Sequence, residues 1–100
     1  MTRQEPLRVL TVCGVGMGSS LILRMTAEDA LRDLGVTAKV EATDVSSARS
    51  MGADVIIGQG MHTGELQGIA PVVITISNFM DKDGLRAQLA ERLGELGWLN

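Results

Sequence analysis

Short runs of β-branched and apolar residues alternate along this chain with stretches of helical periodicity. Three of these runs, at 8–12, 54–58 and 72–76, are nearly continuous in apolar character, which is typical of strands buried on both faces of a sheet. A fourth run, at 37–42, alternates apolar with polar residues and is typical of a half-exposed edge strand. Strands that alternate with helices in this way predict a parallel sheet with helices on both of its faces.

Two long amphipathic helices are predicted. The first begins near Ser19 and ends at Gly35, which is expected to adopt the left-handed conformation. The last begins at a capping residue, Asp81 or Asp83, and ends at Gly97. Their apolar faces consist of Leu23, Ala27, Ala30, Leu31 and Leu34 in the first helix, and of Leu85, Leu89, Leu93 and Leu96 in the last.

The order of these elements predicts a three-layer α/β/α sandwich. Asp44 or Ser46 is expected to cap a further short helix between the second and third strands. Four parallel strands with right-handed crossovers favour the order 2-1-3-4, as in half of a flavodoxin-like fold, with 37–42 at the edge. Residues 1–100 are expected to form one domain, of which residues 1–6 are expected to be a disordered tail.

The composition excludes several classes of function. The chain has 100 residues and is 45% hydrophobic, so it can bury a core, but it has no apolar stretch long enough to span a membrane. A net charge of −3 and only two aromatic residues remove the features of a nucleic-acid binder. One cysteine and one histidine do not make a zinc site. The single cysteine and the absence of a signal peptide predict a cytoplasmic protein.

Cys13 stands at the end of the first predicted strand. In an open parallel sheet, ligands bind beyond the carboxyl ends of the strands where the strand order reverses, here between the first and third strands. The segment CGVGMGSS, at 13–20, follows the first strand, and its glycines at every second position predict a loop. The only cysteine of the chain at the head of this loop is the strongest functional signal in the sequence.

This predicted loop is suited to binding a phosphoryl group. Its backbone N–H groups are expected to form an anion-binding nest, supplemented by the hydroxyls of Ser19 and Ser20 and by the N-terminus of the following helix. No acidic residue between Glu5 and Glu28 opposes an anion. The same field is expected to lower the pKa of the Cys13 thiol. The predicted site has Cys13 as its nucleophile and, as phosphate-binding residues, Gly14, Val15, Gly16, Met17, Gly18, Ser19 and Ser20.

Other roles for Cys13 receive less support. A cysteine at a strand end is often only a small buried apolar residue. A cysteine phosphatase needs an arginine six residues after the cysteine, where this chain has Ser19, and a dithiol redox enzyme needs a second cysteine. Arg24 could add a cation but is read as a solvated helix charge. For His62, a place beside the phosphoryl group and a solvated loop position are both open.

The segment RVLTVCGVGMGSSLILRM, at 8–25, resembles the N-terminus of enzyme IIB components of the sugar phosphotransferase system (PTS), above all the ascorbate type. In that family, a strand leads the cysteine into a CGxGxGSS loop, matched here at 13–20. The segments GADVIIG, at 52–58, and VVITISNFMD, at 72–81, are similar as well. Galactitol-type and lactose-type relatives share the cysteine loop more loosely. The resemblance covers nearly the whole chain as one IIB domain.

The resemblance implies a phosphotransferase that acts as a phosphocarrier. Cys13 would accept a phosphoryl group from a phosphohistidine of a IIA partner and pass it to ascorbate or a related sugar or polyol held by the membrane-embedded IIC transporter. No metal or cofactor is implied, and membrane association would occur through IIC. Two alternatives stay open. One is a flavodoxin-like binding or electron-transfer module. A bound flavin would need aromatic residues on either side of its ring, and the loops offer only Met61 and His62 for this purpose. The other is a regulatory IIB-like domain in which Cys13 is dispensable.

Overall fold

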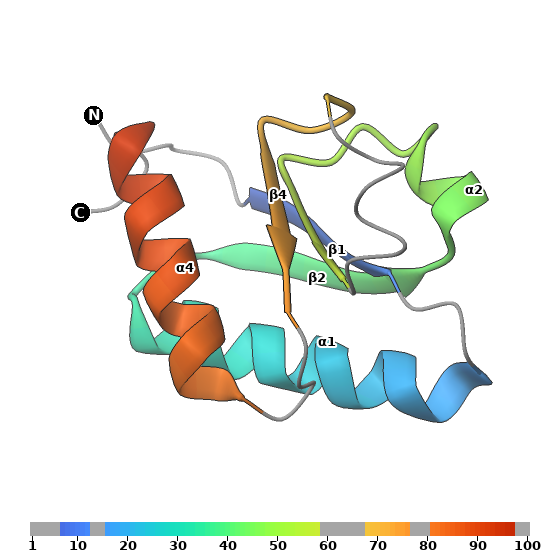
Figure 1. Cartoon of the computed structure of the whole chain (residues 1–100), viewed down its shortest axis with the longest axis horizontal. Coiled ribbons are helices and arrows are strands. Elements are labelled where there is room, and N and C mark those ends of the chain that lie inside the picture. The colour runs from blue at the N-terminus through green and yellow to red at the C-terminus, as the bar shows by residue number, and fades with distance from the viewer. Residues whose placement is uncertain (1–6, 13–15, 59–67, 77–80, 98–100) are drawn as a thin grey trace.

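A computed structural model describes residues 7–12, 16–58, 68–76 and 81–97 of the chain, with the backbone alone for 16–20 and Val45. Figure 1 shows a twisted sheet with helices packed against it. In chain order, the elements are β1 (Leu7–Val12), α1 (Gly16–Asp33), β2 (Ala38–Thr43), α2 (Val45–Ala48), β3 (Val55–Gly58), β4 (Val72–Thr75) and α4 (Lys82–Glu95).

The sheet confirms the strand order predicted from the sequence. Its four strands are parallel and follow the order β2-β1-β3-β4. At its end, β1 places Val12 opposite Thr43 of β2 and opposite Gly58 of β3. Every side chain of β1, β3 and β4 is buried except Arg8 and Thr75, whereas β2 at the edge is half-exposed. The strand order reverses between β1 and β3, where a ligand site is expected.

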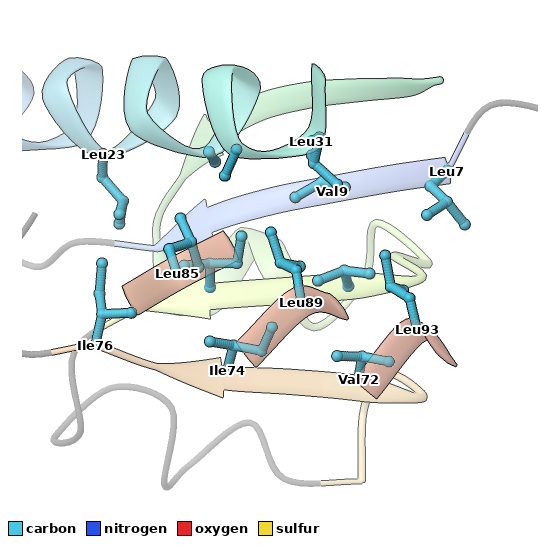
Figure 2. Close-up of a cluster of buried hydrophobic side chains, with 14 residues drawn as sticks. Leu7, Val9, Leu23, Leu31, Val72, Ile74, Ile76, Leu85, Leu89 and Leu93 are labelled. Carbon is cyan, nitrogen blue, oxygen red and sulfur yellow. The ribbon is translucent and has the colours of Figure 1, made fainter. Parts of the chain in front are cut away.

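Helices α1 and α4 together cover one face of the sheet (Figure 2). Leu31 of α1 and Leu89 of α4 are 2% and 0% exposed, and they pack with Val9 and Ile74 of the sheet. Burying one side chain of this size contributes about 1.5–3 kcal/mol to stability. This packing holds α1 in place, and with it the N-terminus of α1. The buried cluster consists of Leu7, Val9, Leu23, Ala27, Ala30, Leu31, Val55, Ile57, Val72, Ile74, Ile76, Leu85, Leu89 and Leu93.

Helix α2 lies on the opposite face of the sheet. Successive strand residues point to opposite faces, so Leu10 and Val12 of β1 face away from α1. They form a second buried cluster with Ala48 of α2, together with Ala53, Ile56 and Val73. Helices therefore lie on both faces, as the alternation of elements predicts.

One helix boundary and one position of the predicted apolar faces differ from the sequence prediction. Helix α1 begins at Gly16 rather than near Ser19, so Gly16 and Gly18 are helical and not part of a loop. Each glycine costs about 1 kcal/mol relative to alanine in a helix, but the buried face of α1 supplies more than this. Leu96 is 44% exposed, because α4 ends at Glu95 and Gly97 then turns the chain with a φ of 73°.

The other helix ends follow the predicted residues. Gly35 comes after α1 with a φ of 70°, in the left-handed region that glycine adopts without steric cost. Asp81 caps α4 by accepting a hydrogen bond from the Gly84 N–H at 3.0 Å. A side chain at Gly84 would collide with that carboxylate, so the glycine allows the cap to close.

Asp44 caps α2 and makes the stability of the fold depend on pH. The Ser47 N–H donates to its carboxylate at 2.7 Å, and this bond, with a second one from the Ser47 hydroxyl, holds the pKa of Asp44 below its ordinary value of 3.8. A depressed folded-state pKa means that the ionised carboxylate stabilises the fold above about pH 4. This contribution is lost as the pH falls through the folded-state pKa.

We therefore expect Asp44→Asn, which keeps a capping side chain, to lose less stability in acid than the parent chain. The measurement is the free energy of unfolding from denaturant titrations between about pH 6 and about pH 3. Parallel curves for the two proteins over this range would contradict the assignment.

Candidate functional site

The predicted site lies at the carboxyl edge of the sheet, where β1 and β3 end together. Val12 is fully buried and pairs with Gly58. Cys13 follows Val12 directly in the chain, and Cys13, Gly14 and Val15 lie outside the described residues. Helix α1 then begins at Gly16. The cysteine thus has a buried strand on one side in sequence and, three residues later, the N-terminus of a packed helix on the other.

The N-terminus of α1 carries N–H groups of the kind that can bind an anion. The first N–H groups of an α-helix have no acceptor within the helix, and those of Gly16, Met17 and Gly18 belong to this first turn. Together with the helix dipole, equivalent to about half a positive charge, they favour a bound phosphoryl group. The backbone donors expected from a nest at 16–18 are therefore helical N–H groups. Of Ser19 and Ser20, also in α1, the backbone alone is described.

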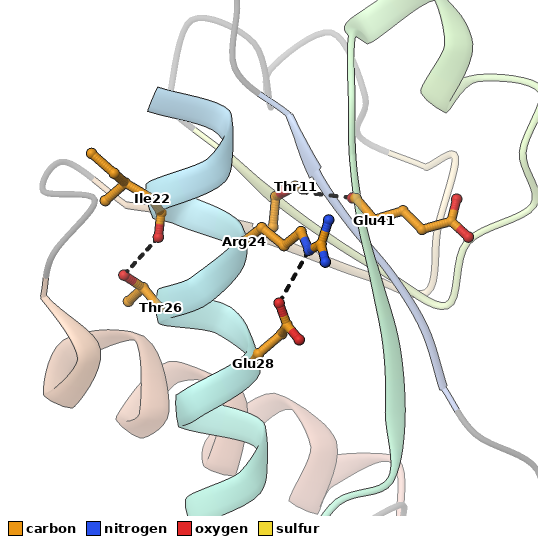
Figure 3. Close-up of polar contacts among 6 residues, drawn as sticks. All are labelled: Thr11, Ile22, Arg24, Thr26, Glu28 and Glu41. Carbon is orange, nitrogen blue, oxygen red and sulfur yellow. Dashed lines mark hydrogen bonds and ion pairs between the residues drawn. The ribbon is translucent and has the colours of Figure 1, made fainter. Parts of the chain in front are cut away.

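Thr11 is a buried polar residue two positions before Cys13. Its side chain is 0% exposed, and its hydroxyl donates to the Glu41 carbonyl of β2 at 3.5 Å (Figure 3). A buried hydroxyl requires a partner of this kind, because burial without one is costly. The contact links the end of β1 to the neighbouring strand. Sequence reasoning included Thr11 in an apolar run, although a single threonine in such a run is a recognisable signal.

Arg24 is engaged in an ion pair on the surface of α1. Its Nε lies 3.1 Å from Oε1 of Glu28, one helical turn away, and the two side chains are 45% and 40% exposed (Figure 3). A pair this exposed contributes at most about 1 kcal/mol to stability. This geometry favours the interpretation of Arg24 as a solvated helix charge.

The structure brings an acidic residue to the edge that sequence proximity did not indicate. Asp44 follows Thr43, and Thr43 lies in register with Val12. Asp44 therefore follows β2 at the same edge of the sheet at which β1 ends, directly before Cys13 in the sequence. The Asp44 carboxylate accepts the Ser47 N–H at 2.7 Å, so its negative charge is held at the start of α2. The electrostatic field at this edge therefore has two sources, the positive end of the α1 dipole and the negative carboxylate of Asp44.

The remaining candidate, His62, lies outside the described residues, as does Met61, so both interpretations of His62 stay predictions. Within the described ranges, no group of three or more His, Cys, Asp and Glu residues could hold a metal ion. No helix in this same part of the chain is long and apolar enough to cross a membrane.

Known proteins share both the sequence and the fold. Residues 8–91 match the family described as "PTS system, Lactose/Cellobiose specific IIB subunit". An ascorbate-specific PTS system EIIB component of Mycoplasma pneumoniae is 32% identical over 90 residues, which cover 87% of this chain and 95% of that protein. A protein of the same name from Salmonella typhimurium is 29% identical over 92 residues, covering 89% of this chain and 91% of that one.

A solved structure agrees with this assignment at the level of the fold. The lactose-specific IIB component domain from Streptococcus pneumoniae aligns with a TM-score of 0.58 and 20% identity, over 92% of this chain and 95% of that one. The family match runs from β1 through the cysteine segment into α4. The chain therefore belongs to the lactose/cellobiose-specific IIB family of the phosphotransferase system.

Proposed function

We propose that this chain is a phosphocarrier in which Cys13 is transiently phosphorylated. The observation that carries the proposal is the place of the only cysteine in the chain. Cys13 directly follows the buried Val12 where the strand order reverses, and α1 presents its first-turn N–H groups from Gly16 onward. A nucleophile at the start of such a turn is well placed to receive an anionic group.

The reaction consists of two in-line transfers. In the first, the Cys13 thiolate attacks the phosphorus of a phosphohistidine on a IIA partner. The S–P bond forms as the P–N bond breaks, and the electron pair returns to the imidazole. In the second, a hydroxyl of the substrate held by a IIC transporter attacks the same phosphorus. The new P–O bond forms, the thiolate leaves, and the hydroxyl proton passes to solvent.

Backbone groups stabilise both transfers. Phosphoryl transfer depends mainly on positioning and on neutralising the charge of the phosphoryl oxygens. We assign this role to the segment Gly14–Ser20, within which 16–18 form the first turn of α1. The charge of Arg24 is satisfied by Glu28, and Ser19 stands where a cysteine phosphatase has its arginine. With serine in place of that arginine, we expect the intermediate to resist hydrolysis.

The names of the relatives support a sugar acid as the final acceptor. The Mycoplasma pneumoniae and Salmonella typhimurium proteins are both ascorbate-specific EIIB components. We therefore propose ascorbate or a related sugar or polyol, with selectivity residing in the IIC partner that holds it. In this proposal, the protein is cytoplasmic and reaches the membrane through IIC.

Phosphorylation in vitro tests the proposed function. With phosphoenolpyruvate, the general PTS phosphotransfer proteins and a IIA, the intact mass of the chain is expected to rise by one phosphoryl group, about 80 Da. A parallel reaction must first show that the IIA phosphorylates its own IIB. With a competent IIA, an unchanged mass would favour a regulatory domain, and flavin absorbance of the purified protein would favour an electron-transfer module.

A further inference from the structure

Three large apolar side chains are exposed in the N-terminal half of α1. Leu21, Ile22 and Met25 are 48%, 44% and 65% exposed, and we call them the α1 patch. The exposed positions in the last turns of α1 are charged instead, at Asp29, Arg32 and Asp33. Apolar exposure on α1 is thus confined to the half that begins at the proposed phosphoryl site, and contiguous patches of this kind mark interaction surfaces.

Helix α4 packs against the other half of α1. Its first turns make ion pairs with Asp33 at the end of α1, from Lys82 at 3.2 Å and from Arg86 at 3.5 Å. Figure 1 shows α4 crossing α1 near this end and continuing away from it on the same face of the sheet. A groove of about 300 Å³ remains beside the α1 patch, lined by Ile22, Met25, Thr26, Asp29 and Lys82.

The size of the α1 patch favours a transient partner over a second copy of the chain. Three half-exposed side chains of this size leave on the order of 200–300 Å² of apolar surface. A standard stable interface buries about 800 Å² on each partner, so the α1 patch is too small to hold two copies together. It is large enough to form the apolar centre of a short-lived contact, and the groove can receive one anchoring side chain.

We propose that the α1 patch is the docking surface for the IIA donor, an inference that rests on the proposed function. At 1.5 Å per residue, Leu21 and Met25 lie about 8 Å and about 14 Å along the helix from Gly16. A donor that brings its phosphorus to Cys13 must cover the start of α1. A transient contact at the lower end of the usual size range, about 600 Å² on each partner, then extends over the α1 patch.

The chemistry of the α1 patch matches a partner that leaves after every transfer. Unbranched methionine adapts to a facing surface at little cost, and Met25 is the most exposed of the three side chains. The IIA surface that fits has apolar side chains beside its phosphohistidine, one of which enters the groove next to Ile22.

The test compares Met25→Glu with Leu96→Glu in single-turnover transfer from phospho-IIA. Leu96 is a matched control because it is 44% exposed and follows α4, at the far end of the molecule from the start of α1 (Figure 1). For Met25→Glu, we expect the IIA concentration at half-maximal rate to rise about tenfold or more, with little change in the rate at saturation. Leu96→Glu is expected to match the parent chain in both quantities.

A second variant and a chemical control separate docking from folding and from charge. Leu21→Gln introduces no charge and is expected to weaken IIA binding in the same direction. The rate of Cys13 alkylation should stay at the parent value in all three variants, because none of them changes the first turn of α1. Unchanged IIA dependence in both α1 variants would overturn the docking proposal, as would a defect confined to transfer from the phosphorylated chain to IIC. A parent chain that gains no phosphoryl group would overturn the proposed function as well.

Discussion

Cys13→Ser is expected to gain no phosphoryl group from phospho-IIA, whereas His62→Ala is expected to gain one. The proposed nucleophile is the Cys13 thiolate, and a thiol side chain has an ordinary pKa of about 8.5. A serine hydroxyl ionises far less readily and needs an adjacent general base to act as a nucleophile. Intact mass spectrometry after the phosphotransfer reaction distinguishes the two variants by the presence or loss of about 80 Da.

The stability of the label identifies the atom that carries it. A thiol phosphate is expected to be cleaved by iodine, and a histidine phosphate to be lost in acid. Circular dichroism of Cys13→Ser should equal that of the parent chain, because the substitution changes a single atom next to the buried Val12. A label that persists in Cys13→Ser and disappears in His62→Ala would move the site to His62, while the family assignment would stand.

Gly16→Pro is expected to slow phosphorylation about 100-fold or more, and Gly16→Ala is expected to have a much smaller effect. Gly16 is the first residue of α1, a position where proline fits the helix geometry and removes an N–H that makes no bond within the helix. If this N–H contacts the phosphoryl oxygens, its loss resembles the loss of one oxyanion-hole donor, which costs about 10²–10³ in rate. Alanine keeps the N–H and has a higher helix propensity than glycine.

The measurement is the rate of transfer from phospho-IIA, with helix content from circular dichroism as the control for both variants. Equal transfer rates for the proline and alanine variants would show that the Gly16 N–H does not stabilise the phosphoryl group. A large and equal loss in both would show that the site requires the absence of a side chain at Gly16 rather than its donor. Both results would contradict the assignment of this N–H to the phosphoryl group.

The glycine-rich segment illustrates how local and tertiary effects compete. Three glycines at every second position favour a loop by their intrinsic propensity. Helix α1 nevertheless includes Gly16 and Gly18, because Leu23 and its buried neighbours hold the helix on the sheet. The backbone N–H groups at these positions therefore belong to the first turn of a helix.

Periodicity along the chain was sufficient to predict the strands, their order and the edge of the sheet at which β1 ends. Buried strands differ from edge strands in pattern, and the pattern at 37–42 placed β2 at the edge, as observed. Because crossovers between parallel strands are right-handed, few topologies remained possible. The point where the strand order reverses then placed the expected ligand site at the carboxyl end of β1. These inferences depend on local spacing and on rules shared by all parallel sheets.

Features that require contact between distant segments could be obtained only from the folded chain. Asp44 reaches the edge beside β1 because Thr43 pairs with Val12, a register that no local pattern encodes. The exposure of Leu21, Ile22 and Met25 likewise depends on where α4 crosses α1. Ion pairs join the two helices at Asp33. Helical periodicity identifies the face of a helix that will be buried. The packing of the two helices on the sheet determines which of the remaining side chains a neighbouring helix covers.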